Sequence, residues 1–290
     1  MGELTKRAGI DLRDNIPVAC KFLKDKFHSQ LHEKNNETME EYKNLMNQSH
    51  ENIVDFYGIT YHVNFGYAIV TGYLPLKDIE KFVAEENKNT IRKADIVNWL
   101  KDIARGMTYI HEKNMIHRDL AARNVLLEEI PDREKIEHDS LNTRAKITDF
   151  GLARPLNSEM EYQIYSGPPL PIRSVAPECL TSTHFSKEND IWAFGCIIWE
   201  LLHRNEKKYP ECKNINELQQ FLITEGKRLK FKEEDTSANY KKLVEVATNC
   251  FCKEPRIRGS FDQILSNLEQ IDYEEDEILY QPSHHTHLKY

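Results

Sequence analysis

The residues that could do chemistry gather in a few short strings. The stretch IHRDLAARN at 116–124 contains Asp119 and Asn124, and the tripeptide DFG at 149–151 begins with Asp149. Carboxylate and amide oxygens are the ligands that hard cations such as Mg²⁺ prefer, and a carboxylate can also accept a proton from a hydroxyl group. These groups suit phosphoryl transfer, which depends on charge neutralisation and alignment of the reactants more than on covalent help from the protein.

Four strings, taken in order, resemble motifs of the protein kinases. IHRDLAARN resembles the catalytic loop, DFG the magnesium-binding loop, APE at 176–178 the end of the activation segment, and DIWAFG at 190–195 the helix after it. One tripeptide is weak evidence, whereas the long loop with three partners in the same order is specific. The resemblance covers about residues 2–271. It implies the α+β class and a bilobal protein kinase fold, with a small β-rich N-lobe whose first strand is missing and a large helical C-lobe.

The resemblance implies a role for each of these polar residues. Asp119 would accept the proton that leaves the substrate hydroxyl, and Asn124 and Asp149 would hold Mg²⁺. Lys21, in the apolar string VACK, resembles the lysine that binds the α- and β-phosphates of ATP; without the other motifs it would be interpreted as a surface lysine. ATP and Mg²⁺ are therefore the cofactors that we expect.

A glutamate should orient that lysine. Counted back from the string HENI at 50–53, the family pattern places it at Glu41, with Glu40 as the second choice. A solvated charge on the predicted helix 37–48 is the structural alternative.

The string IVTGYL at 69–74 resembles the kinase hinge, where adenine binds. Thr71 would be the gatekeeper, and the backbone of Gly72 and Leu74 would pair with the ring. An edge strand that ends in a turn would give the same pattern, so this interpretation depends on the other motifs.

The residues between Asp119 and Asn124 favour tyrosine as the phosphate acceptor. Their LAAR form resembles tyrosine kinases, since serine/threonine kinases usually carry a lysine two positions after the Asp. Arg123 would supply the cation near the γ-phosphate. The string PIR at 171–173 resembles the platform for the substrate ring, although Ser174 stands where most tyrosine kinases have Trp. We expect protein substrates bearing tyrosine as partners; a serine/threonine or dual-specificity enzyme is the alternative.

Tyr162 matches the usual autophosphorylation site of the family. A phosphate there would carry about −1.5 to −2 charges and would pair with Arg118 and with Arg154, which would order the segment. We expect this modification to activate the enzyme. An exposed loop tyrosine without a regulatory role is the alternative.

Hydrophobic periodicity predicts the elements that must position these residues. Strands are predicted at 17–23, 53–60 and 67–71, and helices at 37–48, 96–112, 186–203, 240–252 and 260–271. The resemblance also implies two structural contacts in the C-lobe: an ion pair between Glu178 and Arg258, and backbone N–H bonds from the catalytic loop to Asp190.

These elements predict the domain organisation. A kinase domain would span 1–271, with the N-lobe at 1–71, the hinge at 72–76 and the C-lobe at 77–271. The tail 272–290 is acidic and then His-rich, and we expect it to be disordered.

Composition excludes several other classes of protein. The net charge of −8 argues against a nucleic-acid binder, and the chain shows neither a membrane segment nor a signal peptide. The six cysteines lack metal-ligand spacing and indicate buried reduced thiols, which suits a cytoplasmic protein. Membrane association would require a span or anchor upstream of this sequence.

The resemblance departs from the family at two places. GEL at 2–4 matches only the third glycine of the Gly-rich loop and the two positions after it, so we expect a truncated chain with weak or no activity of its own. The alternative is a kinase-like pseudoenzyme or scaffold with impaired ATP binding. The interval from Asn124 to Asp149 is also unusually long, and its extra residues should form an exposed loop over 128–144 at a hairpin tip, as a decoration or docking site.

Overall fold

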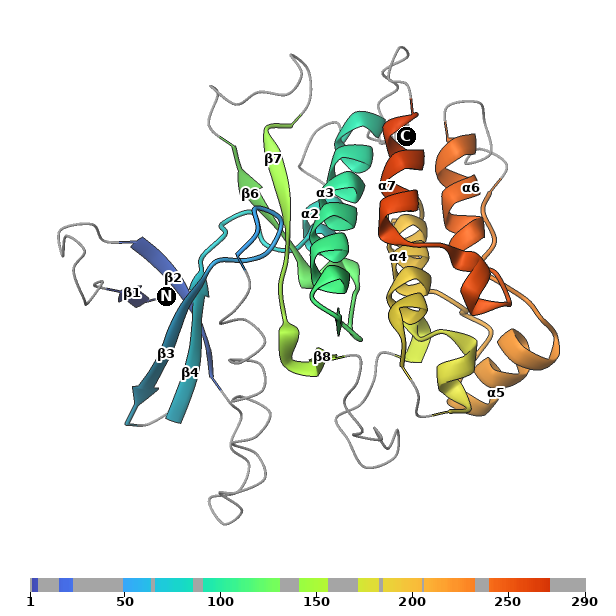
Figure 1. The fold of residues 1–290 in the computed structure, drawn as a ribbon, viewed down its shortest axis with the longest axis horizontal. Coiled ribbons are helices and arrows are strands. Elements are labelled where there is room, and N and C mark those ends of the chain that lie inside the picture. The colour runs from blue at the N-terminus through green and yellow to red at the C-terminus, as the bar shows by residue number, and fades with distance from the viewer. Residues whose placement is uncertain are drawn as a thin grey trace, which may run out of the picture.

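The computed structural model describes residues 2–4, 16–22, 49–63, 66–85, 91–130, 141–155, 172–182, 185–204, 206–232 and 240–271. Figure 1 shows a small β-sheet beside a larger part built mostly of helices. Small antiparallel sheets occupy the N-terminal part and helices dominate the C-terminal part, so the predicted α+β class is confirmed. The predicted helix 37–48, most of the loop 128–144 and the tail 272–290 lie outside the described residues.

The N-terminal sheet is antiparallel, and its described strands follow the order β1-β2-β4-β3. Its strands are β1 Gly2–Leu4, β2 Ile16–Phe22, β3 Phe56–His62 and β4 Gly66–Gly72. The predicted strands at 17–23 and 67–71 are confirmed. The strand predicted at 53–60 begins only at Phe56, because Ile53 forms a parallel bridge with Ile147 instead.

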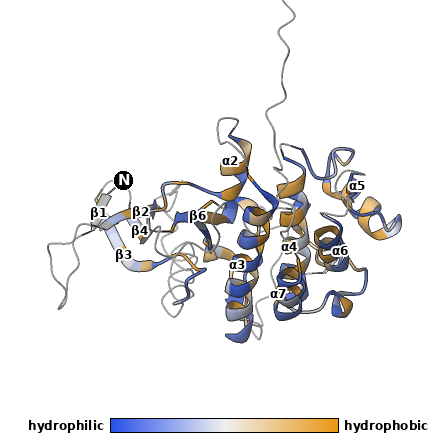
Figure 2. Ribbon diagram, turned by 90° about the horizontal axis from the view of Figure 1, so that it is seen from above, coloured by the Kyte–Doolittle hydropathy of each residue, from blue (hydrophilic) through white to orange (hydrophobic). Residues whose placement is uncertain are grey.

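The helical part confirms the four helices predicted after residue 90, each within a few residues. Its α-helices are α2 Ile79–Ala84, α3 Lys93–Glu112, α4 Lys187–Leu202, α5 Ile215–Gln219, α6 Lys241–Cys250 and α7 Phe261–Glu269. Helices α3 and α7 carry both hydrophobic and hydrophilic residues, as Figure 2 shows. In α4 every residue from Asn189 to Trp199 is buried, which is typical of a helix surrounded by protein. Helix α4 therefore forms the centre of this part.

Two glycines allow close packing of the helices. A Cβ atom on Gly195 of α4 would lie 2.7 Å from Cβ of Cys250, at the end of α6. A Cβ atom on Gly106 of α3 would lie 2.8 Å from Cδ1 of Ile147 and 3.0 Å from the carbonyl oxygen of Asn52. The separations of 2.7 and 2.8 Å are shorter than non-bonded carbon atoms tolerate, so each contact requires glycine.

The sheet is attached to the helical part through backbone hydrogen bonds. The N–H of Val54 donates to the carbonyl of Ile147, and the N–H of Ile147 donates to the carbonyl of Asn52, both at 2.9 Å. The N–H of Leu127 donates to the carbonyl of Lys77 at 3.0 Å. These bonds hold strands β6 and β7 against the segments that enter and leave the sheet.

The predicted loop 128–144 is shorter than expected, because its two ends belong to strands. Strands β6 Val125–Glu129 and β7 Thr143–Ile147 pair from Val125↔Ile147 to Glu129↔Thr143. One acidic residue of β6 meets two basic residues of β7 across the ladder: Glu128 binds Lys146 at 3.1 Å and lies 3.7 Å from Arg144. These opposite charges explain how a charged sequence still forms a hairpin.

Short elements complete the described chain. They are the strands β5 Met115–Ile116 and β8 Arg154–Pro155, which pair; the 3₁₀ turns Ala122–Asn124, Phe150–Leu152, Ile172–Ser174, Pro177–Leu180 and Pro255–Arg258; and the π-helical turn Gln220–Thr224. Within the described ranges, no helix has the length and apolar character needed to cross a bilayer. All six cysteines are free thiols; four are buried as predicted, and Cys20 and Cys252 are half-buried.

Candidate active site

Asp190 of α4 holds the catalytic loop in place. Its carboxylate is 1% exposed and accepts hydrogen bonds from the backbone N–H groups of His117 (2.8 Å) and Arg118 (2.9 Å). Nε2 of His111, at the end of α3, lies 3.0 Å from Oδ2 of Asp190. Burial alone would raise the pKa of Asp190, but the contact with His111 and the N–H bonds outweigh it and lower the pKa. The predicted bonds from the catalytic loop to Asp190 are therefore confirmed.

Asp119 is bound on both of its carboxylate oxygens. A guanidinium nitrogen of Arg123 donates to Oδ1 at 2.5 Å, and Nδ2 of Asn124 donates to Oδ2 at 2.9 Å. Nδ2 of Asn124 also reaches the backbone carbonyl of Asp119 at 2.7 Å. The short turn Ala122–Asn124 makes these contacts possible, because it folds the end of the string back over its start. The structure thus brings three of the predicted residues together.

Lys21 and Asp149 meet across the two parts of the molecule. Nζ of Lys21, on β2, lies 2.6 Å from Oδ1 of Asp149, although 128 positions separate them in the sequence. Burial alone would raise the pKa of Asp149, but the charge and hydrogen bond of Lys21 lower it below its usual value. Asp149 has a left-handed backbone, with φ of 64°, which is uncommon for a residue with a side chain and is often found at functional sites.

Backbone contacts place Asp149 beside the catalytic loop. The N–H of Thr148 donates to the carbonyl of Asn124 at 2.9 Å, and Nε2 of His117 lies 3.1 Å from the carbonyl of Thr148. Phe150, which follows Asp149, is fully buried, and its ring centroid lies 5.0 Å from that of His117. One region therefore contains the carboxylates of Asp149 and Asp119 and the amide of Asn124. The ammonium of Lys21, from the sheet, contacts Asp149 there.

The predicted hinge residues lie at the end of β4. Thr71 is half-buried opposite Ala19 of β2, and Gly72 is buried. The N–H of Gly72 already donates to the carbonyl of Asp55 at 2.9 Å. Any contact of Gly72 with a purine would consequently use its carbonyl oxygen. The carbonyl of Leu74 accepts a bond from the N–H of Lys77 at 3.3 Å, which forms the turn after the strand.

Several predicted residues cannot be placed beside this group. Glu41, Glu40 and Tyr162 lie outside the described residues, so their predicted roles stay predictions. The guanidinium carbon of Arg118 lies 4.4 Å from the ring centroid of Phe185, in a buried position.

Arg154 and Arg173 make local contacts with backbone carbonyls. Arg154 donates to the carbonyls of Ala153 (2.7 Å) and Gly151 (3.2 Å). Arg173, from the predicted substrate platform, sends its guanidinium into the 208–212 loop, where it donates to three carbonyls at 2.6 Å each. The side chain of Arg173 therefore ties the predicted substrate platform to the 208–212 loop.

The predicted ion pair between Glu178 and Arg258 is confirmed, with two parallel contacts of 2.6 and 2.8 Å. The side chain of Arg258 is fully buried, and Asn189 donates a further bond to Glu178 at 2.8 Å. Removing one partner of such a pair leaves a buried charge and typically costs about 3–5 kcal/mol. The pair ties the turn Pro177–Leu180 to the turn Pro255–Arg258, and the Asn189 bond ties it to the start of α4.

Sequence reasoning missed one polar cluster next to the catalytic loop. Glu200 of α4 accepts a bond from the N–H of Ala122 at 3.3 Å and forms an ion pair with Lys208, whose Nζ also donates to Oγ of Ser174 at 2.6 Å. The available signal was Glu200, an acidic residue inside the otherwise apolar string IIWELL at 197–202. A charge at such a position usually has a buried partner.

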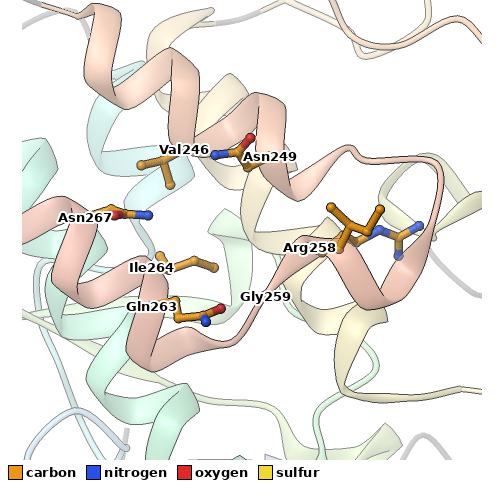
Figure 3. Close-up of a pocket in the computed structure, with 8 residues that line it drawn as sticks. Val246, Asn249, Arg258, Gly259, Gln263, Ile264 and Asn267 are labelled. Atoms are coloured by element: carbon orange, nitrogen blue, oxygen red, sulfur yellow. The ribbon is translucent and has the colours of Figure 1, made fainter.

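Hollows between the described residues lie both beside the site and away from it. A small one of about 10 Å³ adjoins the site and includes Asp119 and Ser174 in its wall. A larger one of about 410 Å³ lies among α6, the turn Pro255–Arg258 and α7, as Figure 3 shows, with the side chains of Asn249, Gln263 and Asn267 around it. No predicted catalytic or nucleotide-binding residue lies among those that line the larger hollow, so it is separate from this site.

A comparison with known families agrees with the fold and with this geometry. The sequence model described as "Protein tyrosine and serine/threonine kinase" matches residues 2–268, which is most of the chain. Members of this family are generally ATP-dependent phosphotransferases that act on proteins. The chain therefore belongs to the protein tyrosine and serine/threonine kinase family.

Proposed function

We propose that this protein transfers the γ-phosphoryl group of ATP to tyrosine hydroxyls of protein substrates. The observation that carries the proposal is the convergence of Lys21, Asp149, Asn124 and Asp119, which come from distant parts of the sequence. Two carboxylates, an amide and an ammonium in one region supply the charges that a phosphoryl donor needs.

Asp119 would accept the proton of the attacking hydroxyl. Its carboxylate is held by Arg123 and Asn124, so it would keep its orientation while the substrate binds. Each carboxylate oxygen has a second lone pair, which leaves room for the hydroxyl hydrogen. Arg123 would also bring a cation close to the transferred phosphoryl group.

Asn124 and Asp149 have oxygen atoms suited to Mg²⁺. The amide nitrogen of Asn124 is bound to Asp119, which leaves its Oδ1 for a cation, and Lys21 occupies only Oδ1 of Asp149. Hard cations prefer such oxygens. Bound Mg²⁺ would neutralise phosphate charge, while Asn124 and Asp149 would hold it beside the catalytic loop.

Lys21 would bind the α- and β-phosphates, oriented by Glu41 on the predicted helix. Adenine would lie against Thr71 and would pair with the backbone of Gly72 and Leu74. In this proposal residues 72–76 are the hinge between an N-lobe at 1–71 and a C-lobe at 77–271. Phosphorylation of Tyr162 would place its charge near Arg118 and activate the enzyme.

The preference for tyrosine is supported by the LAAR string between Asp119 and Asn124. Arg123, the last residue of that string, binds Asp119 directly, so the cation reaches the site from four positions further along the loop. This arrangement leaves the position two residues after Asp119 to an alanine, which is consistent with a bulkier acceptor such as a phenol.

The test is phosphoamino-acid analysis after incubation with magnesium-ATP and a mixture of peptides that contain tyrosine, serine or threonine. We expect phosphotyrosine, and a fall of about 100-fold or more in kcat for Asp119→Asn. Asp262→Asn, at an exposed position of α7, is the control and should keep the parent kcat.

Phosphoserine or phosphothreonine alone would overturn the assignment to tyrosine. If no peptide is phosphorylated but magnesium-ATP raises the melting temperature, this chain binds nucleotide without transferring phosphate, and the transfer proposed here is not supported.

A further inference from the structure

A buried lysine links the substrate side of the site to the centre of the helical part. Lys208 follows α4 and is 9% exposed. Its Nζ donates to Oγ of Ser174 at 2.6 Å and forms an ion pair with Glu200. Ser174 is itself only 5% exposed. Burying an ammonium is costly unless it is paired and hydrogen-bonded, and both conditions are met here.

Glu200 continues this connection to the catalytic loop. Its Oε2 accepts a hydrogen bond from the N–H of Ala122 at 3.3 Å. Ala122 begins the turn Ala122–Asn124, which carries the two side chains that hold Asp119. A continuous path of polar contacts therefore runs from Ser174 through Lys208 and Glu200 to the catalytic loop.

Two further observations relate this path to the substrate side. Arg173, next to Ser174, donates to the backbone carbonyls of Lys208, Tyr209 and Cys212. The turn Ile172–Ser174 and the 208–212 loop are therefore joined both by Arg173 and by the bond between Lys208 and Ser174. Ser174 and Asp119 also line the same small hollow. The position of the segment 173–176 would therefore affect how an acceptor chain lies relative to Asp119.

We propose that Lys208 is a positioning residue for the protein substrate, an inference that rests on the proposed function. Its ammonium fixes Ser174 against Glu200 and so sets the segment 173–176 at the distance from Asp119 that an acceptor hydroxyl requires. Lys208 touches neither ATP nor the reacting atoms. Its loss should consequently weaken the binding of the protein substrate and leave the binding of ATP as it was.

Ser174→Ala is the most direct test, because it removes the hydroxyl while the ion pair between Lys208 and Glu200 stays. A hydrogen bond to a charged group in a buried place is worth about tenfold in an equilibrium constant. We expect the KM for a tyrosine peptide to rise about tenfold, while the KM for ATP changes less than twofold. A general loss of folded protein would lower kcat without this selective rise.

Lys208→Met tests the ammonium, with Lys207→Met at the exposed neighbouring position as the matched control. Because Lys208→Met leaves the half-buried Glu200 without its cation, the pair Lys208→Met with Glu200→Gln is measured as well. If the role runs through Ser174, then adding Ser174→Ala to Lys208→Met should raise the peptide KM by less than twofold further. The control should match the parent.

Hydrogen exchange of the backbone amides in 173–180 gives a readout that needs no turnover. Ser174→Ala and Lys208→Met should each accelerate exchange there, and Lys207→Met should not. An inactive parent chain would count against the proposed function, and the exchange data would still decide the role of Lys208. Unchanged exchange in both variants, or equal rises in the KM values for peptide and ATP, would overturn the inference.

Discussion

Asp119 is fixed from two sides before any substrate is present. Arg123 binds one carboxylate oxygen and Asn124 binds the other, both from the turn that follows in the same loop. Groups that are already oriented need little reorganisation when charge moves during a reaction. At the scale of single residues, the orientation of the Asp119 carboxylate therefore comes from local contacts, four and five positions further along the chain.

Lys21 differs from Asp119 because its contact joins the two parts of the molecule and is open to solvent. The Lys21 side chain is 53% exposed and that of Asp149 is 39% exposed. Exposed ion pairs contribute about 0–1 kcal/mol to stability, so this pair is not needed to hold the fold. Its position agrees with the nucleotide-binding role that we propose for Lys21.

Lys21→Met should therefore separate stability from function. We expect the melting temperature of the free protein to change by only a few degrees, since the lost ion pair is exposed. The rise in melting temperature on adding magnesium-ATP should largely disappear, because the phosphates lose their cation. Differential scanning calorimetry with and without nucleotide measures both quantities.

Lys77→Met is the matched control for this experiment. Lys77 also forms an exposed ion pair, with Glu85 at 3.3 Å. That variant should keep the full response to magnesium-ATP. A normal nucleotide response in Lys21→Met would contradict the role proposed for Lys21.

At the scale of elements, α4 organises the site although none of its residues would touch a nucleotide. Asp190, near its start, fixes the backbone of the catalytic loop, and Glu200, near its end, reaches Ala122. The position of α4 depends in turn on close packing against α6 at Gly195.

Gly195→Ala should destabilise the protein, even though alanine has the higher helix propensity. The new methyl group would lie 2.7 Å from Cβ of Cys250 and 2.9 Å from Cε1 of Phe251, so the helices would have to separate. Overpacking of this kind costs about 1–3 kcal/mol, against a gain of about 1 kcal/mol from propensity. Urea unfolding monitored by circular dichroism gives the free energy of unfolding.

Glu245→Ala, on the exposed side of α6, is the control and should stay within about 0.5 kcal/mol of the parent. If Gly195→Ala were as stable as the parent, the close contact between α4 and α6 would not limit packing.

Elements with strong periodicity could be predicted from the sequence, and contacts between distant segments could not. The helices at 93–112 and 187–202 differ from the prediction by at most three residues, because long apolar faces leave little choice. The ends of the 128–144 loop were wrong, since charged residues there satisfy each other across a hairpin. Composition alone does not distinguish such a ladder from a solvated loop.

The candidate site shows the same limit. The strings around Asp119 and Asp149 indicated which residues to expect, and the structure places them together. The link from Ser174 to Lys208 was missed, because a lysine 34 positions away in a polar stretch has the pattern of a surface residue. Only the fold shows that this lysine is buried.

At the scale of the whole molecule, buried acids with shifted pKa values contribute to the dependence of stability on pH. Asp102 of α3 is the unusual case, because burial raises its pKa from 3.8 to about 6. The N–H of Ala145, which donates to Oδ2 at 2.9 Å, and the guanidinium of Arg105 only partly offset this effect. Asp149 and Asp190 shift in the opposite direction.

Folding therefore favours the protonated form of Asp102. Its contribution to stability is complete below about pH 4 and is lost as the pH rises through about 6, with a difference of at most about 3 kcal/mol. Asp102→Asn cannot titrate at this position. Between pH 5 and pH 7 its free energy of unfolding should therefore rise relative to that of the parent, which loses the contribution of Asp102. Urea unfolding at a series of pH values measures this difference.

Asp262→Asn, at an exposed carboxyl, should show the same pH profile as the parent. Parallel profiles for the parent and Asp102→Asn would mean that Asp102 titrates normally in the folded protein.

The bonds between residues 52–54 and Ile147 have a mechanical consequence. Ile147 lies two positions before Asp149, and it is bonded to the chain just before that chain enters the sheet. A rocking motion of the sheet about this joint would swing Lys21 through an arc while Asp149 stays near the pivot. The distance between the Lys21 ammonium and the Asp149 carboxylate, 2.6 Å in this structure, would then report how far the sheet has rotated toward the helical part.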